Sequence, residues 1–184
     1  MSNIIDDIES KRNEIYNESG KNMFFKKQQK NNIAQQISNQ FDINQLFHLT
    51  CYTKDQMVIV DYTVLKLYAH PENYQQIINY IMNIYRGKIG SMVDFHFNIN
   101  GFTVTSAERY KDLIKMYFDV TQNAEFDVTQ MTNKIYIYYT PSIIHQLTKM
   151  LQAFIPDEIK ERVIYISKKD SEAAWASITQ PIQS

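Results

Sequence analysis

The chain has 184 residues, enough for one compact domain with a sizeable hydrophobic core. Its 19 lysine and arginine residues nearly balance 20 aspartate and glutamate residues, and this formal net charge of -1 argues against a nucleic-acid-binding protein with a broad cationic surface. The single cysteine, Cys51, excludes an intrachain disulfide and a cysteine-based zinc site, and it indicates a reducing compartment.

The first 20 residues contain acidic side chains and lack the apolar stretch of a signal peptide. No apolar run reaches the roughly 20 residues that a membrane-spanning helix needs. We therefore expect a cytoplasmic protein whose contact with membranes is peripheral. Asn, Ile, Lys and Tyr are abundant. Because their codons are AT-rich, the composition also indicates an AT-biased genome, such as that of a protist, a parasite or a large virus.

Residues 1–40 form a polar N-terminal extension, which we separate from an α/β domain at 41–184. The extension is rich in Asn, Gln and Lys, and its sparse apolar residues recur at helical spacing, with Gly20 between two expected helices. The two stripes are Ile5, Ile8, Arg12 and Ile15, then Phe25, Ile33, Ile37 and Phe41. Because these apolar faces are thin, the helices must pack on another surface or fray.

The chain from residue 45 onward begins with strand patterns. Residues 45–53 and 57–68 are rich in β-branched and aromatic side chains, and they predict a hairpin with a short turn between its strands. From Pro71 to Gly87 the apolar residues recur at i, i+3, i+4 and i+7, which predicts an amphipathic helix. Residues 91–101 then predict a third strand.

The remaining elements continue the alternation of strands and helices. Residues 105–108, Thr-Ser-Ala-Glu, match a capping box and predict the start of a helix. After a polar connector, 134–140 predicts a strand, 142–154 a helix and 162–167 a last strand, with a short helix around Trp175 in the tail. The order β-β-α-β-α-β-α-β predicts an α/β fold with a mostly parallel sheet, an N-terminal hairpin and covering helices.

Motifs that carry catalytic chemistry are absent from the sequence. It contains no glycine-rich phosphate loop after a strand and no G-x-S-x-G motif. Asp94 and His96 share one face of a predicted strand, where they could serve as a metal or acid–base pair. The alternatives are a strand-end hydrogen bond or a solvated sheet face. Cys51 is interpreted as a small core residue. We therefore expect a protein that is not an enzyme and has no metal or cofactor.

A basic and aromatic cluster near the N-terminus is a candidate membrane contact. Phe24 and Phe25 precede Lys26 and Lys27, so the rings could enter the acyl boundary while the lysines meet anionic headgroups. The alternative is that one Phe packs on the core and the lysines face water.

Two stretches resemble the CRAL-TRIO lipid-binding domain family. In VDFHFNINGFTVTSAERYKDLIKMYFD, a strand ends in an Asn-rich turn with Gly and leads into a helix. In NKIYIYYTPSIIHQLTKMLQAFIPDEIKERVIYIS, a strand leads through a proline turn to a helix, and the last strand starts with a basic residue. The resemblance spans residues 46–167 and is closest to the compact branch found in Rho GTPase-activating and neurofibromin-like proteins.

The resemblance implies non-enzymatic binding of a hydrophobic ligand, a phospholipid, in a pocket between the sheet and a mobile gate helix at 142–154. It also implies lipid transfer or membrane-linked signalling. The implied gate residues are Ile143, Ile144, Leu147, Met150, Leu151 and Phe154. The implied pocket floor is Val58, Val60, Phe95, Phe97, Ile135, Ile137 and Tyr139. Arg162 matches the basic residue of the family's headgroup site.

An alternative function keeps the same fold without a pocket. In it, the apolar strands and helices form an ordinary packed core, and the chain is a protein-interaction or assembly module. The N-terminal helices would then bind a protein partner or a second copy of the chain. In either case we expect a lipid, a membrane surface or a protein as the partner, and no nucleic acid.

Overall fold

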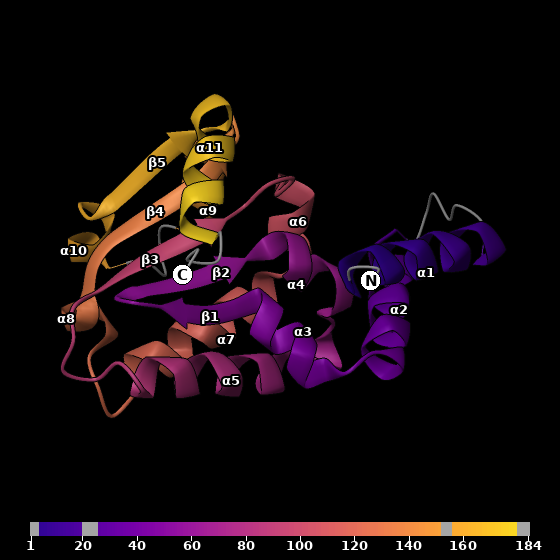
Figure 1. The fold of residues 1–184 in the computed structure, drawn as a ribbon, viewed down its shortest axis with the longest axis horizontal. Helices are drawn as coiled ribbons and strands as arrows, with labels where there is room; N and C mark the ends of the chain where they lie inside the picture. Colours follow the sequence, from indigo (N-terminus) through magenta and orange to yellow (C-terminus); the bar gives the residue numbers. More distant parts are fainter. Residues whose placement is uncertain (1–3, 20–25, 152–155, 180–184) are drawn as a thin grey trace.

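A five-stranded β-sheet organises the part of the chain that the structure describes (Figure 1). The structure is a computed structural model, and it describes residues 4–19, 26–151 and 156–179. The strands are β1 (Cys51–Lys54), β2 (Met57–Asp61), β3 (Val93–Asn98), β4 (Thr132–Thr140) and β5 (Val163–Ser167), in that order across the sheet. The pair β1–β2 is antiparallel and the other neighbours are parallel. The predicted α/β class with a mostly parallel sheet and an N-terminal hairpin is confirmed.

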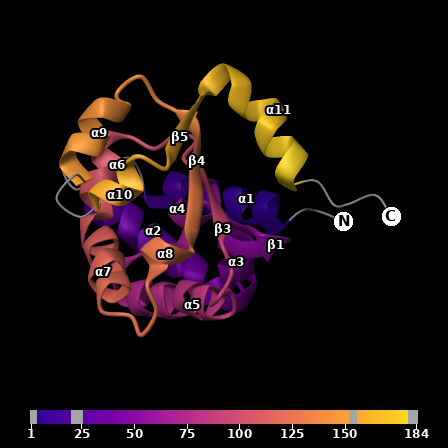
Figure 2. The same cartoon turned by 90° about the vertical axis from the view of Figure 1, so that its left-hand side faces the viewer.

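The helices lie on both faces of this sheet. They are α1 (Ile4–Ser19), α2 (Lys26–Gln40), α3 (Ile43–Thr50), α4 (Tyr62–Tyr68), α5 (Tyr74–Arg86), α6 (Val104–Arg109), α7 (Lys111–Gln122), α8 (Val128–Met131), α9 (Ile144–Leu151), α10 (Asp157–Lys160) and α11 (Lys168–Thr179), with a 3-10 turn η1 (Pro71–Asn73) before α5. Because the parallel strands follow chain order, right-handed crossovers put the connecting helices on one face. Figure 2 shows α7 and α9 on one side of β4 and β5, and α11 on the other.

Side chains alternate between these two faces. Phe95 packs edge-on against Tyr85 of α5, with ring centroids 5.3 Å apart, and so marks the face that carries the crossover helices. Tyr138 packs against Trp175 of α11 at 5.1 Å and marks the other. We call the first the crossover face and the second the α11 face.

The first predicted strand is wrong for most of its length, because 45–50 belongs to α3. The Asp42 side chain accepts a hydrogen bond from the Asn44 backbone N–H at 2.9 Å and caps this helix. Leu46, Phe47 and Thr50 are buried, which is the spacing of one helical face and not of a strand. The β-branched and aromatic content suggested a strand, whereas the cap at Asp42 was missed.

The second predicted strand is also too long. It ends at Asp61, whose carboxylate accepts a hydrogen bond from the Thr63 backbone N–H at 2.7 Å and starts α4. The capping box predicted from Thr105 is wrong as well. The cap is Thr103, whose hydroxyl accepts from the Ser106 backbone N–H at 3.2 Å, so the helix begins earlier. The predicted helix from Pro71 to Gly87 is confirmed by η1 and α5.

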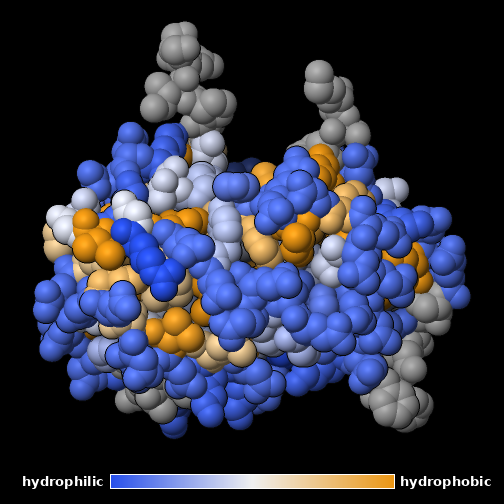
Figure 3. Space-filling view, turned by 90° about the horizontal axis from the view of Figure 1, so that it is seen from below, coloured by the Kyte–Doolittle hydropathy of each residue, from blue (hydrophilic) through white to orange (hydrophobic). Residues whose placement is uncertain are grey.

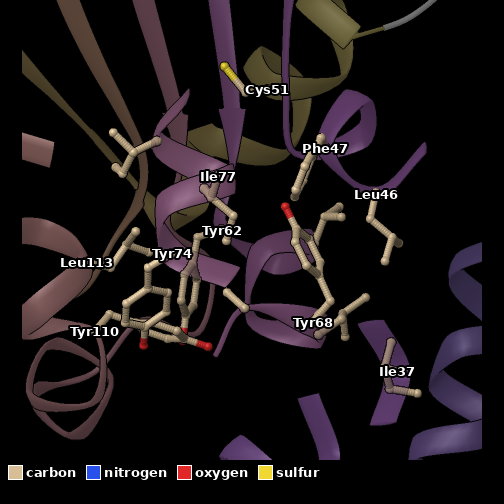
Figure 4. Close-up of a cluster of buried hydrophobic side chains, with 14 of the residues drawn as sticks. Ile37, Leu46, Phe47, Cys51, Tyr62, Tyr68, Tyr74, Ile77, Tyr110 and Leu113 are labelled. Carbon is tan, nitrogen blue, oxygen red and sulfur yellow. The ribbon is translucent and has the colours of Figure 1, made fainter. Parts of the chain in front are cut away.

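The N-terminal extension packs on the same core as the sheet domain. Ile8 and Ile37 are 0 % exposed and belong to one buried cluster with Leu46 and Tyr68. Helices α1 and α2 both contact α4, and Figure 4 shows Ile37 beside the Tyr68 end of this cluster. The thin apolar stripes of α1 and α2 are therefore used inside the molecule. Gly20 lies outside the described residues, between α1 and α2.

Helix α11 covers the second face of the sheet, where the sequence predicted only a short tail helix. It starts directly after β5 and crosses back, so that the Lys54 ammonium at the end of β1 donates to the backbone carbonyl of Ile178 at 2.9 Å. At its start, Ser171 is fully buried and its hydroxyl accepts from the Tyr139 backbone N–H at 2.6 Å. This helix therefore ties the last strand to the first.

The surface seen from the side of α5 and α7 is mostly hydrophilic, with separate hydrophobic patches (Figure 3). Among the described residues, the large apolar residues with the highest solvent exposure are Ile89, which is 57 % exposed, and Met92, which is 55 % exposed. Among the described residues, no helix combines the length and the hydrophobicity needed to cross a bilayer.

We predict that Ile37→Ala destabilises the whole domain. The substitution leaves a cavity beside Leu46 and Tyr68, and it should lower the free energy of unfolding by about 2–5 kcal/mol. The measurement is urea unfolding followed by the fluorescence of Trp175, the single tryptophan, which lies on α11 across the sheet. The matched control Gln36→Ala changes an exposed neighbour on α2. An unchanged midpoint for Ile37→Ala would show that the extension unfolds independently.

Candidate functional site

The inner half of the predicted pocket floor is closely packed. Val58 and Phe95 are adjacent in the register of β2 and β3, and both are buried on the crossover face. Tyr85 covers Phe95, and its hydroxyl bonds to the hydroxyl of Tyr117 on α7 at 2.9 Å. Burial raises the pKa of the Tyr117 hydroxyl to about 12. Helices α5 and α7 therefore fill this half with two tyrosine side chains.

The outer half of the floor is covered less completely. Val60, Phe97 and Ile137 are adjacent in the register of β2, β3 and β4, and all three are half-buried. Ile135 is half-buried too. Because β3 and β4 are interior strands, their side chains would be fully buried under a closely packed helix. The crossover face therefore divides into a filled half and a partly open half.

Tyr165 extends the open half onto the edge strand. It is the register partner of Ile137, so it lies on the crossover face, and its hydroxyl is 3.3 Å from the hydroxyl of Thr148 on α9. Despite this contact, the Tyr165 side chain is 46 % exposed. Sequence reasoning missed this residue, although the alternation from Val163 along β5 would have placed it with Ile137.

The predicted gate helix corresponds to α9. It begins at Ile144, two residues after the predicted start, and packs against α6. Leu147 is buried, whereas Ile143 and Ile144 are half-buried. Phe154 lies outside the described residues, as do the side chains of Met150 and Leu151. The printed contact between this helix and the open half of the floor is that of Thr148 with Tyr165.

Tyr139 occupies a special position at the end of the floor. Its φ of 57° is in the left-handed region, which residues other than glycine rarely adopt. The register between β4 and β5 shifts between Ile137 and Thr140, so Tyr139 lies at this irregularity. Its backbone N–H donates a hydrogen bond to the hydroxyl of Ser171 on α11. The irregularity therefore redirects the chain just before the proline turn that leads to α9.

Arg162 and the aromatic–basic cluster lie elsewhere. One terminal guanidinium nitrogen of Arg162 donates to the backbone carbonyls of Thr129 and Thr132, at 2.6 and 2.5 Å, and thereby fastens α8 and the start of β4. Lys26 and Lys27 are exposed at the start of α2, whereas Phe24 and Phe25 lie outside the described residues. The structure therefore does not bring Arg162 and the lysine pair together.

The predicted pair Asp94 and His96 lies on the α11 face, away from the pocket floor. The Asp94 carboxylate accepts hydrogen bonds from the Asn133 side chain at 2.8 Å and the Lys134 backbone N–H at 3.2 Å, so it links β3 to β4. Within the described ranges, no group of three His, Cys, Asp or Glu side chains could hold a metal ion. Asp94 therefore makes the strand hydrogen bond that the sequence left open, and α11 covers part of the face expected to be solvated.

His96 is buried among aromatic side chains. It is 5 % exposed and stacks on Tyr136, with ring centroids 4.7 Å apart. Its Nδ1 is 2.9 Å from the Tyr138 hydroxyl, and its Nε2 has no hydrogen-bond partner in the described chain. Burial lowers the pKa of the imidazole, and the negative charge of Asp94 partly opposes this change.

Cys51 is a core residue, as the sequence predicted. It is 0 % exposed, and burial raises the pKa of its thiol to about 12. A neutral buried thiol is a poor nucleophile.

A scan of the chain against protein-family models finds no matching family, and a search of curated proteins finds no matching relative.

We predict that His96 makes stability depend on pH. Because burial lowers its folded pKa below the ordinary value of about 6.5, the unfolded chain binds the proton more tightly. The stabilising contribution is therefore present above about pH 6.5 and is lost as the pH falls below it. His96→Gln should lose less free energy of unfolding than the wild type between about pH 7.5 and about pH 5.

The measurement is urea unfolding at both pH values. His145→Gln, which changes an exposed histidine on α9, is the control and should behave like the wild type. Equal acid sensitivity in the wild type and in His96→Gln would contradict the assignment.

Proposed function

We propose that the chain binds a hydrophobic ligand, a phospholipid, between α9 and the open half of the crossover face, in a CRAL-TRIO-like manner. The observation that carries this proposal is the exposure of Tyr165, which is 46 % although its side chain lies on the crossover face and contacts α9. Phe97 and Ile137 beside it are half-buried on interior strands. Burying such apolar surface is worth about 25 cal/mol per Å2, so a hydrophobic ligand would be stabilised there.

The order of elements agrees with this proposal. The hairpin, the alternating strands and helices, and the helix after a proline turn follow the order that the CRAL-TRIO resemblance implies. Ile143, Ile144 and Leu147 on the α9 side would supply a second apolar wall. The proposal assigns binding by burial and no catalytic step. Lys26 and Lys27, exposed on α2, are the proposed peripheral membrane contact, and Arg162 remains the headgroup candidate of the resemblance.

A second candidate function is protein interaction through the β5 edge of the sheet. Strand β5 is the last in the sheet order, and Ile164 on its α11 face is 38 % exposed. An edge strand with exposed apolar side chains can pair with a strand of another chain. Assembly through α1 and α2 is the other form of this candidate, and a partner would meet the exposed faces of these helices, because Ile8 and Ile37 are fully buried in the core.

We predict that wild-type protein carries a stoichiometric lipid and that Leu147→Trp does not. The larger ring would fill the space beside α9, and the amount of co-purified lipid should fall at least about tenfold. The measurement is solvent extraction of the purified protein followed by mass spectrometry.

Leu113→Trp is the matched control, since Leu113 is buried on α7 in the main hydrophobic core and not on α9. It should strain the core by a similar amount, of order 1–3 kcal/mol, and keep the lipid. Near-UV circular dichroism checks that both variants are folded. No lipid in folded wild-type protein would favour the interaction module instead, and lipid retained by folded Leu147→Trp would show that α9 does not close the pocket.

A further inference from the structure

Three tyrosines from separate elements meet beneath the N-terminal extension. Tyr62 opens α4, Tyr74 opens α5 and Tyr110 joins α6 to α7. The ring of Tyr110 lies 6.0 Å from that of Tyr62 and 6.5 Å from that of Tyr74, centroid to centroid. Figure 4 shows their hydroxyls pointing in the same direction, away from Cys51. We call these residues the tyrosine triad.

Two of the three hydroxyls are buried without a partner. The Tyr62 hydroxyl donates to the hydroxyl of Ser106 at 2.9 Å. The hydroxyl oxygens of Tyr74 and Tyr110 have no hydrogen-bond partner in the described chain, and each residue is only 2 % exposed. Nearly all buried polar groups in proteins are hydrogen-bonded, so two such hydroxyls in one cluster indicate a binding position for a group that accepts hydrogen bonds.

A guanidinium group lies against the triad. The guanidinium of Arg109 lies 4.8 Å from the centre of the Tyr110 ring, and it donates to the Asn31 side chain of α2 at 2.9 Å and to the Ala69 carbonyl after α4 at 3.2 Å. Arg109 therefore joins the extension to the sheet domain at this place.

Lys30 lies close enough to three other cations to be affected by their charges. The pKa of Lys30 is lowered, first by burial and then by the positive charges of Arg109, Arg12 and Lys26. Within the described ranges the salt bridges are made by other side chains, so Arg12, Lys30 and Arg109 are not paired with a carboxylate. An anion would relieve this repulsion.

The charges also act on the triad itself. Burial raises the pKa of Tyr74 to about 12, Arg109 opposes this change, and the Asp112 carboxylate adds to it more weakly. Burial raises the pKa of Tyr110 as well, and Arg109 and Arg12 oppose it. The phenols are therefore neutral hydrogen-bond donors at neutral pH, within the field of two guanidinium groups.

The place in the fold is suitable for a ligand. Helix α4 follows β2 and α6 follows β3, so the triad lies beyond the carboxyl ends of two parallel strands. Open α/β sheets bind their ligands on this side of the sheet.

We propose that the tyrosine triad and Arg109 bind a phosphate group, either free or in a monoester, and that α1 and α2 close over it. A phosphate accepts hydrogen bonds from several directions and carries a charge of about -1.5 to -2, which matches two free hydroxyls and three unpaired cations. Because both hydroxyls are buried, the extension must open to admit the ligand and close around it. This site is separate from the proposed hydrophobic pocket under α9.

The test is thermal unfolding of the full chain titrated with inorganic phosphate, with sodium chloride at matched ionic strength as the reference. Wild-type protein should be stabilised by phosphate, with a rise in Tm of about 3–6 °C at ten times Kd. The Tyr74→Phe/Tyr110→Phe double variant keeps the ring packing and removes both hydroxyls. Its Kd for phosphate should be at least about tenfold weaker.

Tyr85→Phe is the matched control, because Tyr85 is equally buried but its hydroxyl is bonded to Tyr117. This variant should bind phosphate like the wild type. Wild-type protein that responds equally to phosphate and chloride would overturn the proposal. An unchanged phosphate affinity in the folded double variant would overturn it too.

The source of the phosphate group can be identified with the same assay. Dihexanoyl phosphatidic acid, below its micelle concentration, is compared with inorganic phosphate in the wild type and in the double variant. If the wild type binds the lipid more tightly than inorganic phosphate, and the double variant loses this lipid binding, the site holds a lipid headgroup. If the wild type binds inorganic phosphate more tightly than the lipid, the site holds a free ion. Binding of neither ligand would overturn the assignment.

Discussion

The parallel pairing of β2, β3, β4 and β5 in chain order is the constraint on which the rest of the fold depends. Each parallel connection must cross the sheet with the same hand, so all connecting helices lie on one face. The opposite face would be open to water if α11 did not turn back across it. Two contacts fix α11 in place. The ring of Trp175 packs on Tyr138, and the Lys54 ammonium donates a hydrogen bond to the backbone carbonyl of Ile178.

Tyrosine fills much of the core, and its hydroxyl determines how the core is arranged. Where a partner is near, the hydroxyls pair, as Tyr85 does with Tyr117 and Tyr68 does with Thr50 at 2.9 Å. Each pair lets a large ring be buried without an unsatisfied polar atom. The hydroxyls of Tyr74 and Tyr110 have no such partner. These two residues lie where the N-terminal extension meets the β2–β3 and β3–β4 connections. The buried tyrosine hydroxyls that have no partner in the described chain thus lie at one junction, apart from His96 Nε2 on the other face of the sheet.

The regular elements were predictable where local patterns and tertiary packing agree. The helix after Pro71 and the strand containing Phe95 follow the expected periodicity. The strand predicted at 45–53 was wrong between Gln45 and Thr50, because it was inferred from local aromatic and β-branched content. The cap at Asp42 and the burial of one helical face instead favour helix α3. For the site, alternation correctly placed Phe97 and Ile137 on one face. It could not show that α5 and α7 would leave both of them half-buried.

The sequence by itself determined the α/β class, the hairpin edge and the burial of Cys51, because these depend on periodicity and on short-range spacing. Only the tertiary structure decided that α1 and α2 complete the core, that Trp175 of α11 covers Tyr138 and that Arg109 reaches α2 beside the tyrosine triad. Those contacts join residues far apart in the chain. Arg109 and Asn31, for example, are 78 positions apart, and no local pattern encodes their distance.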